Sequence, residues 1–366
     1  MEAIWSFSRT LISFVVSLGI LIFIHEFGHF LIAKIFKIKV ERFSLGFGPR
    51  LFGKEVGDTE YRVSAFPLGG YVKMLGESAD EKIPEELQSV SFSHQPLRRR
   101  MAVVAAGPTS NLLLAVFLYG LIFTFFGLTK TTTDIGSVTP ESPAAAAGLQ
   151  ANDKVLEVDG VPVQEWGELS ALIQESGSRP VQLRLQRGDE VFGVELTPEI
   201  KQTRTILGEE VSRPLIGITA SNNIIVEKVN PFQAVYHAVV YTGSMIKLTF
   251  IVLGKLIVGA ISPRTLAGPI GIAQMSGQVA QAGPLAFVSF LALLSINLGI
   301  LNLLPIPILD GGHLVFFSIE AVMGKPLSMK KREMAQQVGL FLLIVLMAFV
   351  FYNDIYRLVY PGAGMP

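Results

Sequence analysis

The feature that most constrains the fold is a long apolar run, from Leu11 to Ala33, that contains the pattern His-Glu-x-x-His. A helix over this run is roughly 35 Å long at about 1.5 Å per residue, which is enough to cross a hydrocarbon core of about 30 Å. A soluble helix needs a polar face, and here only Ser13, Ser17 and the pattern itself are polar. The run therefore predicts a membrane span that carries polar chemistry inside the hydrocarbon.

The pattern itself consists of His25, Glu26 and His29. Residues four apart on a helix lie one above the other, so the two imidazoles share a face and can hold one zinc ion. Glu26 lies beside that ion, where its carboxylate can take a proton from water. A structural origin is disfavoured, because ionisable groups inside hydrocarbon are costly and tend to mark function. We predict catalytic Glu26 with metal ligands His25 and His29.

The composition agrees with a membrane protein. Half of the 366 residues are hydrophobic and only 16% are charged. The formal net charge is zero, so nothing points to nucleic acid as a partner. Cysteine is absent, so a metal must be held by histidine and carboxylate groups.

Three further apolar segments predict membrane spans, which gives a membrane α-helical core of four transmembrane helices. They cover about Met101–Phe126, Leu285–Leu304 and Val338–Tyr352. In the second, Asn111 is expected to hydrogen-bond across helices. Residues 226–261 are apolar but interrupted by lysines, so we interpret them as amphipathic helices at the membrane surface.

Basic clusters predict the orientation. They follow the first span and precede the second and fourth, at Lys34, Lys37, Lys39 and Arg42, at Arg98–Arg100 and at Lys330–Arg332. With four spans all of them lie on one side, which the positive-inside rule assigns to the cytoplasm. Both termini and residues 127–222, between the second and third spans, are then expected on the periplasmic or extracytoplasmic side. The active site is expected toward the cytoplasm.

Two segments between the spans favour β structure. Residues 40–75 contain two short strands joined at Pro67–Gly70, a β-hairpin region expected to associate with the membrane. Its edge at Gly69, Gly70 and Tyr71 can pair an extended peptide. Residues 127–222 contain several strand patterns, with strict alternation over Val181–Leu185 and a hairpin signal at Asp159-Gly160, which predict an inserted, compact β-rich domain with two helices. The predicted parts are therefore membrane core 1–126, β-rich domain 127–222, amphipathic helices and linker 223–284, and membrane core 285–366.

The third apolar segment ends in a second polar pattern. Asn302 is followed by Pro305 and Pro307, which break the helix at membrane depth, and then by Asp310 before two glycines. Irregular backbone is tolerated there only against protein or a wet cavity. Asp310 either starts a turn or binds metal, and a site with two histidines lacks a third ligand, so we favour the metal. Asn302, Pro305 and Pro307 are predicted to contact substrate.

These patterns together resemble the site-2 protease family of intramembrane zinc metalloproteases, and most of all its bacterial regulator-of-sigma-E branch. They occur in family order over almost the whole chain. They are His25-Glu26-Phe27-Gly28-His29, Gly46-Phe47-Gly48-Pro49, Leu68-Gly69-Gly70-Tyr71-Val72-Lys73, Gly107-Pro108 with Asn111, Gly268-Pro269-Ile270, and Asn302 to Gly311.

The resemblance implies a zinc ion on His25, His29 and Asp310, with Glu26 as general base. It implies that Asn302 and the Gly69–Tyr71 edge engage an unwound substrate helix. The β-rich segment is similar to a circularly permuted PDZ domain, with an edge at Leu215–Ile218 that would bind peptide or protein C-termini. The chain has room for one such domain, whereas some members of the branch carry two.

The implied activity is hydrolysis of peptide bonds within transmembrane segments. Its substrates would be single-span proteins already trimmed outside the membrane, such as anti-sigma factors or signal-peptide remnants, in a bacterial inner membrane. Two other classes are weighed against it. A non-catalytic scaffold leaves Glu26 and Asp310 buried without a purpose. A proton-coupled transporter is disfavoured because no inverted repeat is visible.

Overall fold

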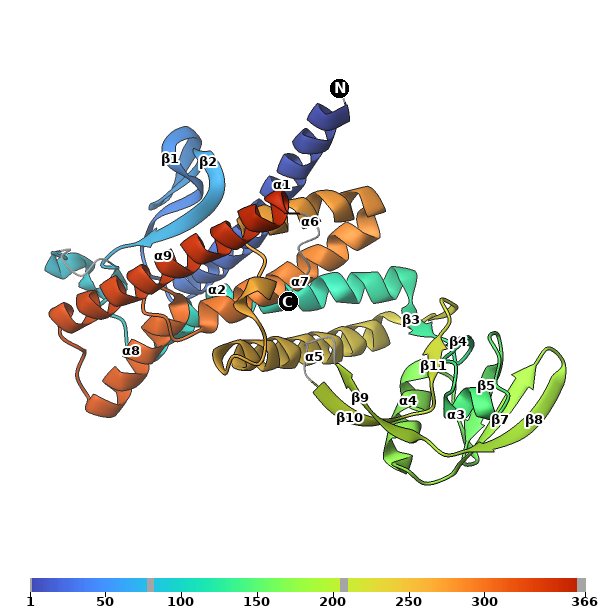
Figure 1. Ribbon diagram of the computed structural model, residues 1–366. Coiled ribbons are helices and arrows are strands. Elements are labelled where there is room, and N and C mark those ends of the chain that lie inside the picture. The colour runs from blue at the N-terminus through green and yellow to red at the C-terminus, as the bar shows by residue number, and fades with distance from the viewer. Residues whose placement is uncertain (1, 78–81, 205–209, 361–366) are drawn as a thin grey trace. The chain divides into compact units, whose positions relative to one another are not determined.

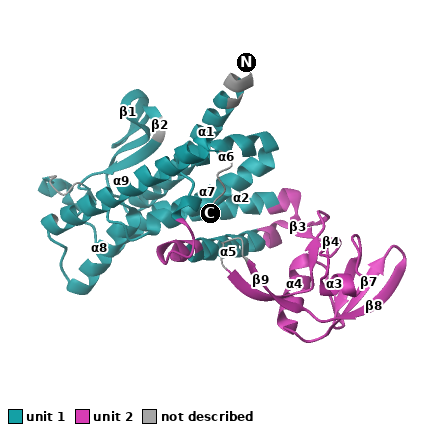
Figure 2. Ribbon diagram, viewed as in Figure 1, with its two compact units in different colours: residues 1–122, 235–251, 263–366 teal, residues 123–234, 252–262 magenta. Residues whose placement is uncertain are grey.

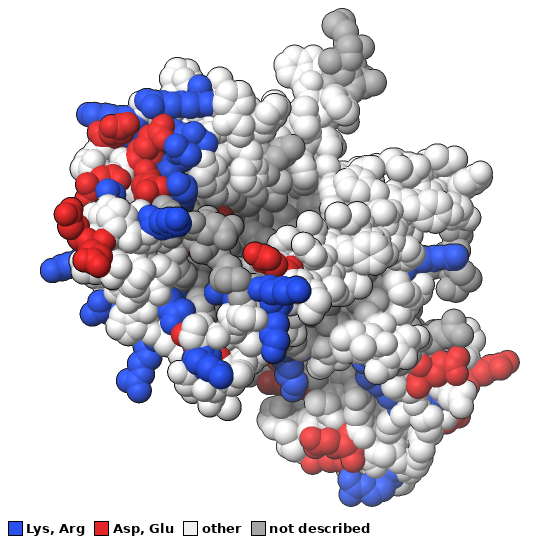
Figure 3. Space-filling model, turned by 90° about the vertical axis from the view of Figure 1, so that its left-hand side faces the viewer, with Lys and Arg blue, Asp and Glu red and all other residues white. Residues whose placement is uncertain are grey.

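Long apolar stretches of sequence form the dominant helices of the computed structural model, which describes residues 2–77, 82–204 and 210–360 (Figure 1). Within these residues, five helices are long and apolar enough to cross a membrane. They are α1 (Glu2–Ile35), α2 (Leu97–Phe126), α5 (Pro231–Ile257), α7 (Pro284–Leu303) and α9 (Met329–Val359). Many large apolar side chains on them are exposed. Figure 3 shows large uncharged areas, with charged side chains gathered in groups at the left, near the centre and at the lower right of the view.

Helix α5 is the element that departs from the predicted spans. Residues 231–257 form one continuous helix rather than several shorter ones. The Asn230 side chain accepts a hydrogen bond from the Gln233 amide, and the Gln233 side chain accepts one from the Asn230 amide, which closes the first turn. The count of four spans, and the placement of both ends on one side, therefore stay predictions. Residues 1 and 361–366 lie outside the described residues.

The chain divides into two units, shown in Figure 2. The first contains residues 1–122, 235–251 and 263–366. Besides the long helices it holds α6 (Pro269–Ala282), α8 (Asp310–Met323) and the short 3-10 helices Glu85–Val90 and Pro263–Thr265. One buried apolar cluster joins the end of α1, the β strands, the first part of α2 and the middle of α8. Its members are Ala33, Ile38, Val40, Phe43, Val72, Met74, Phe92, Val103, Val104 and Phe317. This cluster brings three distant segments of sequence together.

The β region of this unit has two long strands, β1 (Val40–Val56) and β2 (Thr59–Met74). They turn at Gly57, whose φ of 61° suits glycine. Residues 42–45 of β1 lie between two parts of β2, residues 60–63 on one side and 70–73 on the other. The predicted hairpin at Pro67–Gly70 is therefore wrong in one respect, because the two segments flank β1 and do not pair with each other. The hairpin turn is at residues 57–58.

The second unit contains residues 123–234 and 252–262. Its central sheet has the order β6 (Val161–Pro162), β5 (Lys154–Val158), β7 (Val181–Arg187) and β8 (Glu190–Leu196). Three further antiparallel pairs are β3 (Leu128–Thr131) with β12 (Ile224–Glu227), β4 (Ile135–Val138) with β11 (Ile218–Ala220), and β9 (Glu199–Arg204) with β10 (Glu210–Leu215).

Alternation along β7 explains the core of this unit. Val181, Leu183 and Leu185 are buried while the residues between them are exposed. The helices α3 (Pro143–Ala146) and α4 (Trp166–Ser176) contribute Ala144, Leu169 and Ile173 to the same core. The unit thus has a hydrophobic core of its own.

Candidate metal centre

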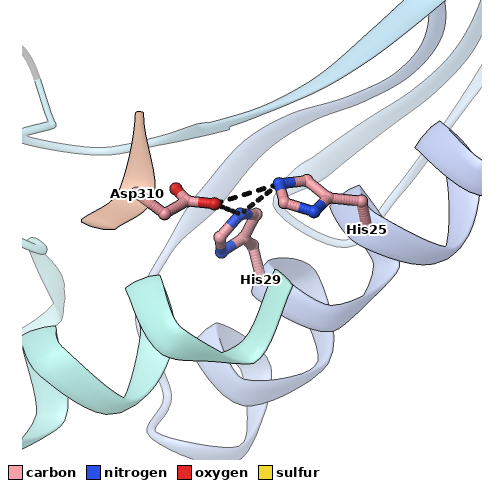
Figure 4. A group of neighbouring side chains, drawn as sticks. All are labelled: His25, His29 and Asp310. Carbon is pink, nitrogen blue, oxygen red and sulfur yellow. Dashed lines mark hydrogen bonds and ion pairs between the residues drawn. The ribbon is translucent and has the colours of Figure 1, made fainter. Parts of the chain in front are cut away.

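Two histidines of α1 lie one turn apart and are both buried, as the helical spacing predicts. Their rings meet edge to face with centroids 4.9 Å apart. The Nε2 atoms of His25 and His29 are 3.3 Å apart and point toward the same spot (Figure 4). One face of α1 therefore offers two ring nitrogens to a single position.

Asp310 completes the group from the first residue of α8. Its Oδ2 atom lies 3.1 Å from Nε2 of His25 and 3.5 Å from Nε2 of His29. The loop before α8 sets this position, since a Cβ on Gly311 would collide with the carbonyl oxygens of Leu303 and Leu304. Glycine after Asp310 lets the start of α8 fold directly against the end of α7. The structure thus brings together the three predicted ligands, although Asp310 lies far from the two histidines in the sequence.

Helix α2 also contacts the two imidazoles. The Nδ1 atom of His29 lies 2.8 Å from the carbonyl oxygen of Val103, so Nδ1–H donates and Nε2 keeps a free lone pair. Gly107 faces the rings, and a Cβ there would overlap Nε2 of His29 and lie 2.9 Å from Cε1 of His25. The side-chain amide of Asn111 lies 3.3 Å from Nδ1 of His25. Val103 and Gly107 were not predicted as site residues.

The chemistry of the three donor atoms fits a cation. With His29 protonated on Nδ1, its Nε2 and the carboxylate oxygen of Asp310 are both acceptors, and they face each other at 3.5 Å. Oδ2 of Asp310 is buried and makes no hydrogen bond with any other group that the structure describes. A tetrahedral zinc ion about 2.0–2.1 Å from each ligand keeps its ligands roughly 3.3 Å apart. All three atoms lie within 4.8 Å of one another, so the set suits zinc.

Glu26 lies next to the first histidine and contacts the β region. Its Oε2 atom accepts a hydrogen bond of 3.1 Å from the backbone amide of Val72. Val72 belongs to residues 70–73 of β2, here called the outer part of β2, which pair with β1 along one side. The side of this segment that does not pair with β1 therefore faces Glu26, the carboxylate that the sequence predicts as the base.

The predicted substrate-contacting residues lie in two places. Asn302 is half-buried near the end of α7, and Pro305 and Pro307 lie in the loop that leads to Asp310. Gly69 and Gly70 are buried, and the ring of Phe47 stacks on Tyr71 with centroids 6.1 Å apart. Contact of these residues with a substrate stays a prediction.

Comparison with known proteins gives concordant matches. The model of Peptidase family M50 matches residues 13–346. A protein of Mesorhizobium japonicum with the provisional name of a zinc metalloprotease is 36% identical over 364 residues, 96% of this chain and 99% of that protein. The regulator of sigma-E protease RseP of Escherichia coli is 32% identical, over 96% of this chain and 100% of that protein.

A solved PDZ domain, that of the SdrC-like protein of Listeria monocytogenes, matches 25% of this chain and 90% of that domain at 24% identity. The TM-score of this match is 0.21.

Proposed function

The chain belongs to peptidase family M50 and is an intramembrane zinc metalloprotease of the site-2 protease type, and from this premise we propose what it cuts and which residues do so. The proposed substrates are transmembrane segments of single-span proteins that have already been trimmed outside the membrane. Anti-sigma factors and remnants of signal peptides have this form. The proposed compartment is a bacterial inner membrane, with the active site toward the cytoplasm.

One observation carries the assignment of the site. His25, His29 and Asp310 converge with ligand atoms 3.1–3.5 Å apart, and Glu26 is next to them on a helix that can span a membrane. A structural ion pair does not need two imidazoles aimed at one carboxylate oxygen. A metal-dependent hydrolase needs this arrangement together with an adjacent carboxylate.

Zinc, when bound, supplies a Lewis acid that polarises the scissile carbonyl and acidifies water. The protein groups would do the rest. Glu26 would accept the proton of the attacking water and return it to the leaving amine. The Val72 amide, which donates to Oε2 of Glu26, would hold the carboxylate in place for this transfer.

Access to the peptide bond requires an extended substrate, because a helix hides its amides within its own hydrogen bonds. The outer part of β2, residues 70–73, has one side free of β1 and lies beside Glu26. We propose that a substrate segment pairs with this side by main-chain hydrogen bonds. Asn302 and the loop with Pro305 and Pro307 would contact the same segment near Asp310.

The second unit offers a separate binding surface. A groove of about 250 Å³ is lined by Trp166, Leu169 and Ile173 on α4 and by the segment Pro214–Ile218. Residues 215–218 are the edge that the sequence predicts for peptide binding. We propose that this unit is a PDZ domain and that the groove binds the C-terminus of a peptide or protein.

Purified variants with a model single-span substrate test the catalytic proposal. Wild type should bind about one zinc per chain and cut a substrate without its outer domain faster than the intact form. Glu26→Gln should keep zinc and lose cleavage by at least about 100-fold, since the base is gone. Asp310→Ala should lose both.

His94→Ala is the control for zinc content, because His94 bonds to Ser91 away from the ligands. Cleavage by Glu26→Gln at the wild-type rate would refute the proposed base. Full zinc content in Asp310→Ala would refute the ligand set, and equal cutting of both substrate forms would refute the proposed substrate class.

A further inference from the structure

Asn111 makes a contact that neither packing nor catalysis explains. It lies on α2, is fully buried, and faces Nδ1 of His25 at 3.3 Å. Its backbone carbonyl accepts a hydrogen bond of 2.7 Å from the Ser295 hydroxyl of α7. In the side-chain amide, the nitrogen faces His25. The oxygen, Oδ1, has no hydrogen-bond partner within the described residues.

The orientation of this amide decides which nitrogen of His25 carries the proton. If the amide nitrogen donates to Nδ1, the neutral ring must hold its proton on Nε2. Nε2 is the atom that faces Asp310 and His29, and a protonated nitrogen cannot bind a metal. If Oδ1 faces the ring, Nδ1–H donates to it and Nε2 is free. The two orientations have nearly the same shape, and each makes one hydrogen bond to the ring.

The same logic already holds for the neighbouring ligand. Nδ1–H of His29 donates a hydrogen bond to the carbonyl oxygen of Val103, four residues before Gly107 on the same helix. An amide oxygen of Asn111 would do for His25 what the backbone carbonyl does for His29. Helix α2 would then present one carbonyl-type acceptor to each imidazole.

We propose that Asn111 is a positioning residue for the metal site, whose Oδ1 accepts a hydrogen bond from Nδ1–H of His25 and so leaves the Nε2 lone pair directed toward the ion. Ser295 contributes by holding the backbone of Asn111 from α7. Loss of such an acceptor typically costs 10–100-fold in metal affinity. This inference rests on the zinc site proposed above.

Three variants separate an acceptor role from simple packing. Asn111→Leu keeps a similar volume but has no acceptor, and zinc affinity measured by chelator competition should fall 10–100-fold. Asn111→Asp keeps an oxygen facing the ring and should stay within about threefold of wild type, a rescue that a packing role does not predict. Asn297→Leu is the matched control, because this amide on α7 contacts Thr249 and not a histidine. Its zinc affinity should be unchanged.

Nitrogen-15 spectra of histidine-labelled, zinc-loaded wild type give a second readout that does not depend on how a variant folds. The expected state of His25 is Nδ1 protonated with Nε2 bound to the metal. Zinc bound through Nδ1, or wild-type affinity in a folded Asn111→Leu variant, would overturn the inference alone. Failure of wild type to bind zinc would instead overturn the proposed function, and this inference with it.

Discussion

At the scale of single residues, the two imidazoles fit against α2 because residue 107 is glycine and has no side chain. Gly107 of α2 lies against both rings, so even one methyl group there would displace Nε2 of His29. Packed interiors do not absorb such an overlap without moving a neighbour. The positions of the two histidine rings therefore depend on the close approach of α2 to α1 at Gly107.

We expect Gly107→Ala to lower zinc affinity by at least about 10-fold, because second-layer changes around metal ligands have this size. Chelator competition on purified protein measures it. Gly120→Ala is the matched control on the same helix, since its Cβ would meet Val235 and Ala238 at 3.9 and 4.0 Å, an ordinary contact. This control should bind zinc normally and be as stable as wild type or slightly more stable. Wild-type zinc affinity in Gly107→Ala would show that the rings can move aside.

Residues of the site differ in how well sequence alone predicts them. His25, Glu26 and His29 follow from the helical repeat within one element, and Asp310 follows from the missing third ligand. Val103 contacts a histidine 74 residues away, and Asn111 one 86 residues away. Such contacts depend on how two helices cross, which no local pattern contains. For Asn111 the sequence indicates a cross-helix hydrogen bond but not its partner.

At the scale of elements, the long helices α1, α2, α7 and α9 were predictable because each contains an apolar run long enough to cross a membrane. The interpretation of residues 226–261 as several helices was wrong for 231–257 because it relied on Lys247 and Lys255. Lysine is a good helix former, so a lysine within an apolar run does not end a helix. In the β region, the position of β1 between two parts of β2 depends on pairings between residues distant in sequence.

An ion pair connects α8, which carries the ligand Asp310, with α2, which carries the residues that contact the two histidines. Arg100 of α2 donates through both terminal nitrogens to the carboxylate of Glu320 on α8, with one contact at 3.2 Å. Their side chains are only 13% and 14% exposed, and the guanidinium lies 5.0 Å from the centre of the Phe317 ring. Because a nearly buried charge left alone is costly, the pair should act as a unit.

We expect Arg100→Gln to reduce the free energy of unfolding by about 1–3 kcal/mol, since Glu320 loses its partner. The double variant Arg100→Gln with Glu320→Gln should lose less than the sum of the two single variants. Thermal unfolding in detergent, with zinc content recorded alongside, measures both. Arg99→Gln is the control, because Arg99 bonds to the nearby Gln95. Strict additivity would show that the pair contributes no coupling between α2 and α8.

At the scale of the whole molecule, the chain combines a helical unit with a β-rich unit that has its own core. That core consists of residues between Ile135 and Ile216. The strands β3 and β12 pair at the two ends of this unit, with Thr131 opposite Ile224. The sequence-based boundary of 127–222 removes β12, because its apolar residues Ile224, Ile225 and Val226 do not alternate with polar ones. Composition alone shows where the character of the chain changes, but not which strand closes the unit.

We therefore expect a fragment of residues 127–228 to fold alone and to unfold in one cooperative transition in urea. A fragment of residues 127–222 should be less stable by about 1–3 kcal/mol, because it loses four cross-strand pairs. It also loses the ion pair of 3.0 Å between Lys130 and Glu227. Circular dichroism during urea unfolding compares the two fragments. A Glu227→Gln variant of the longer fragment isolates the small contribution of the ion pair, because Lys130 keeps its contact with Glu165. Equal stability of the two fragments would mean that β12 does not close the unit, and an unfolded longer fragment would mean that the unit needs the helical part of the chain.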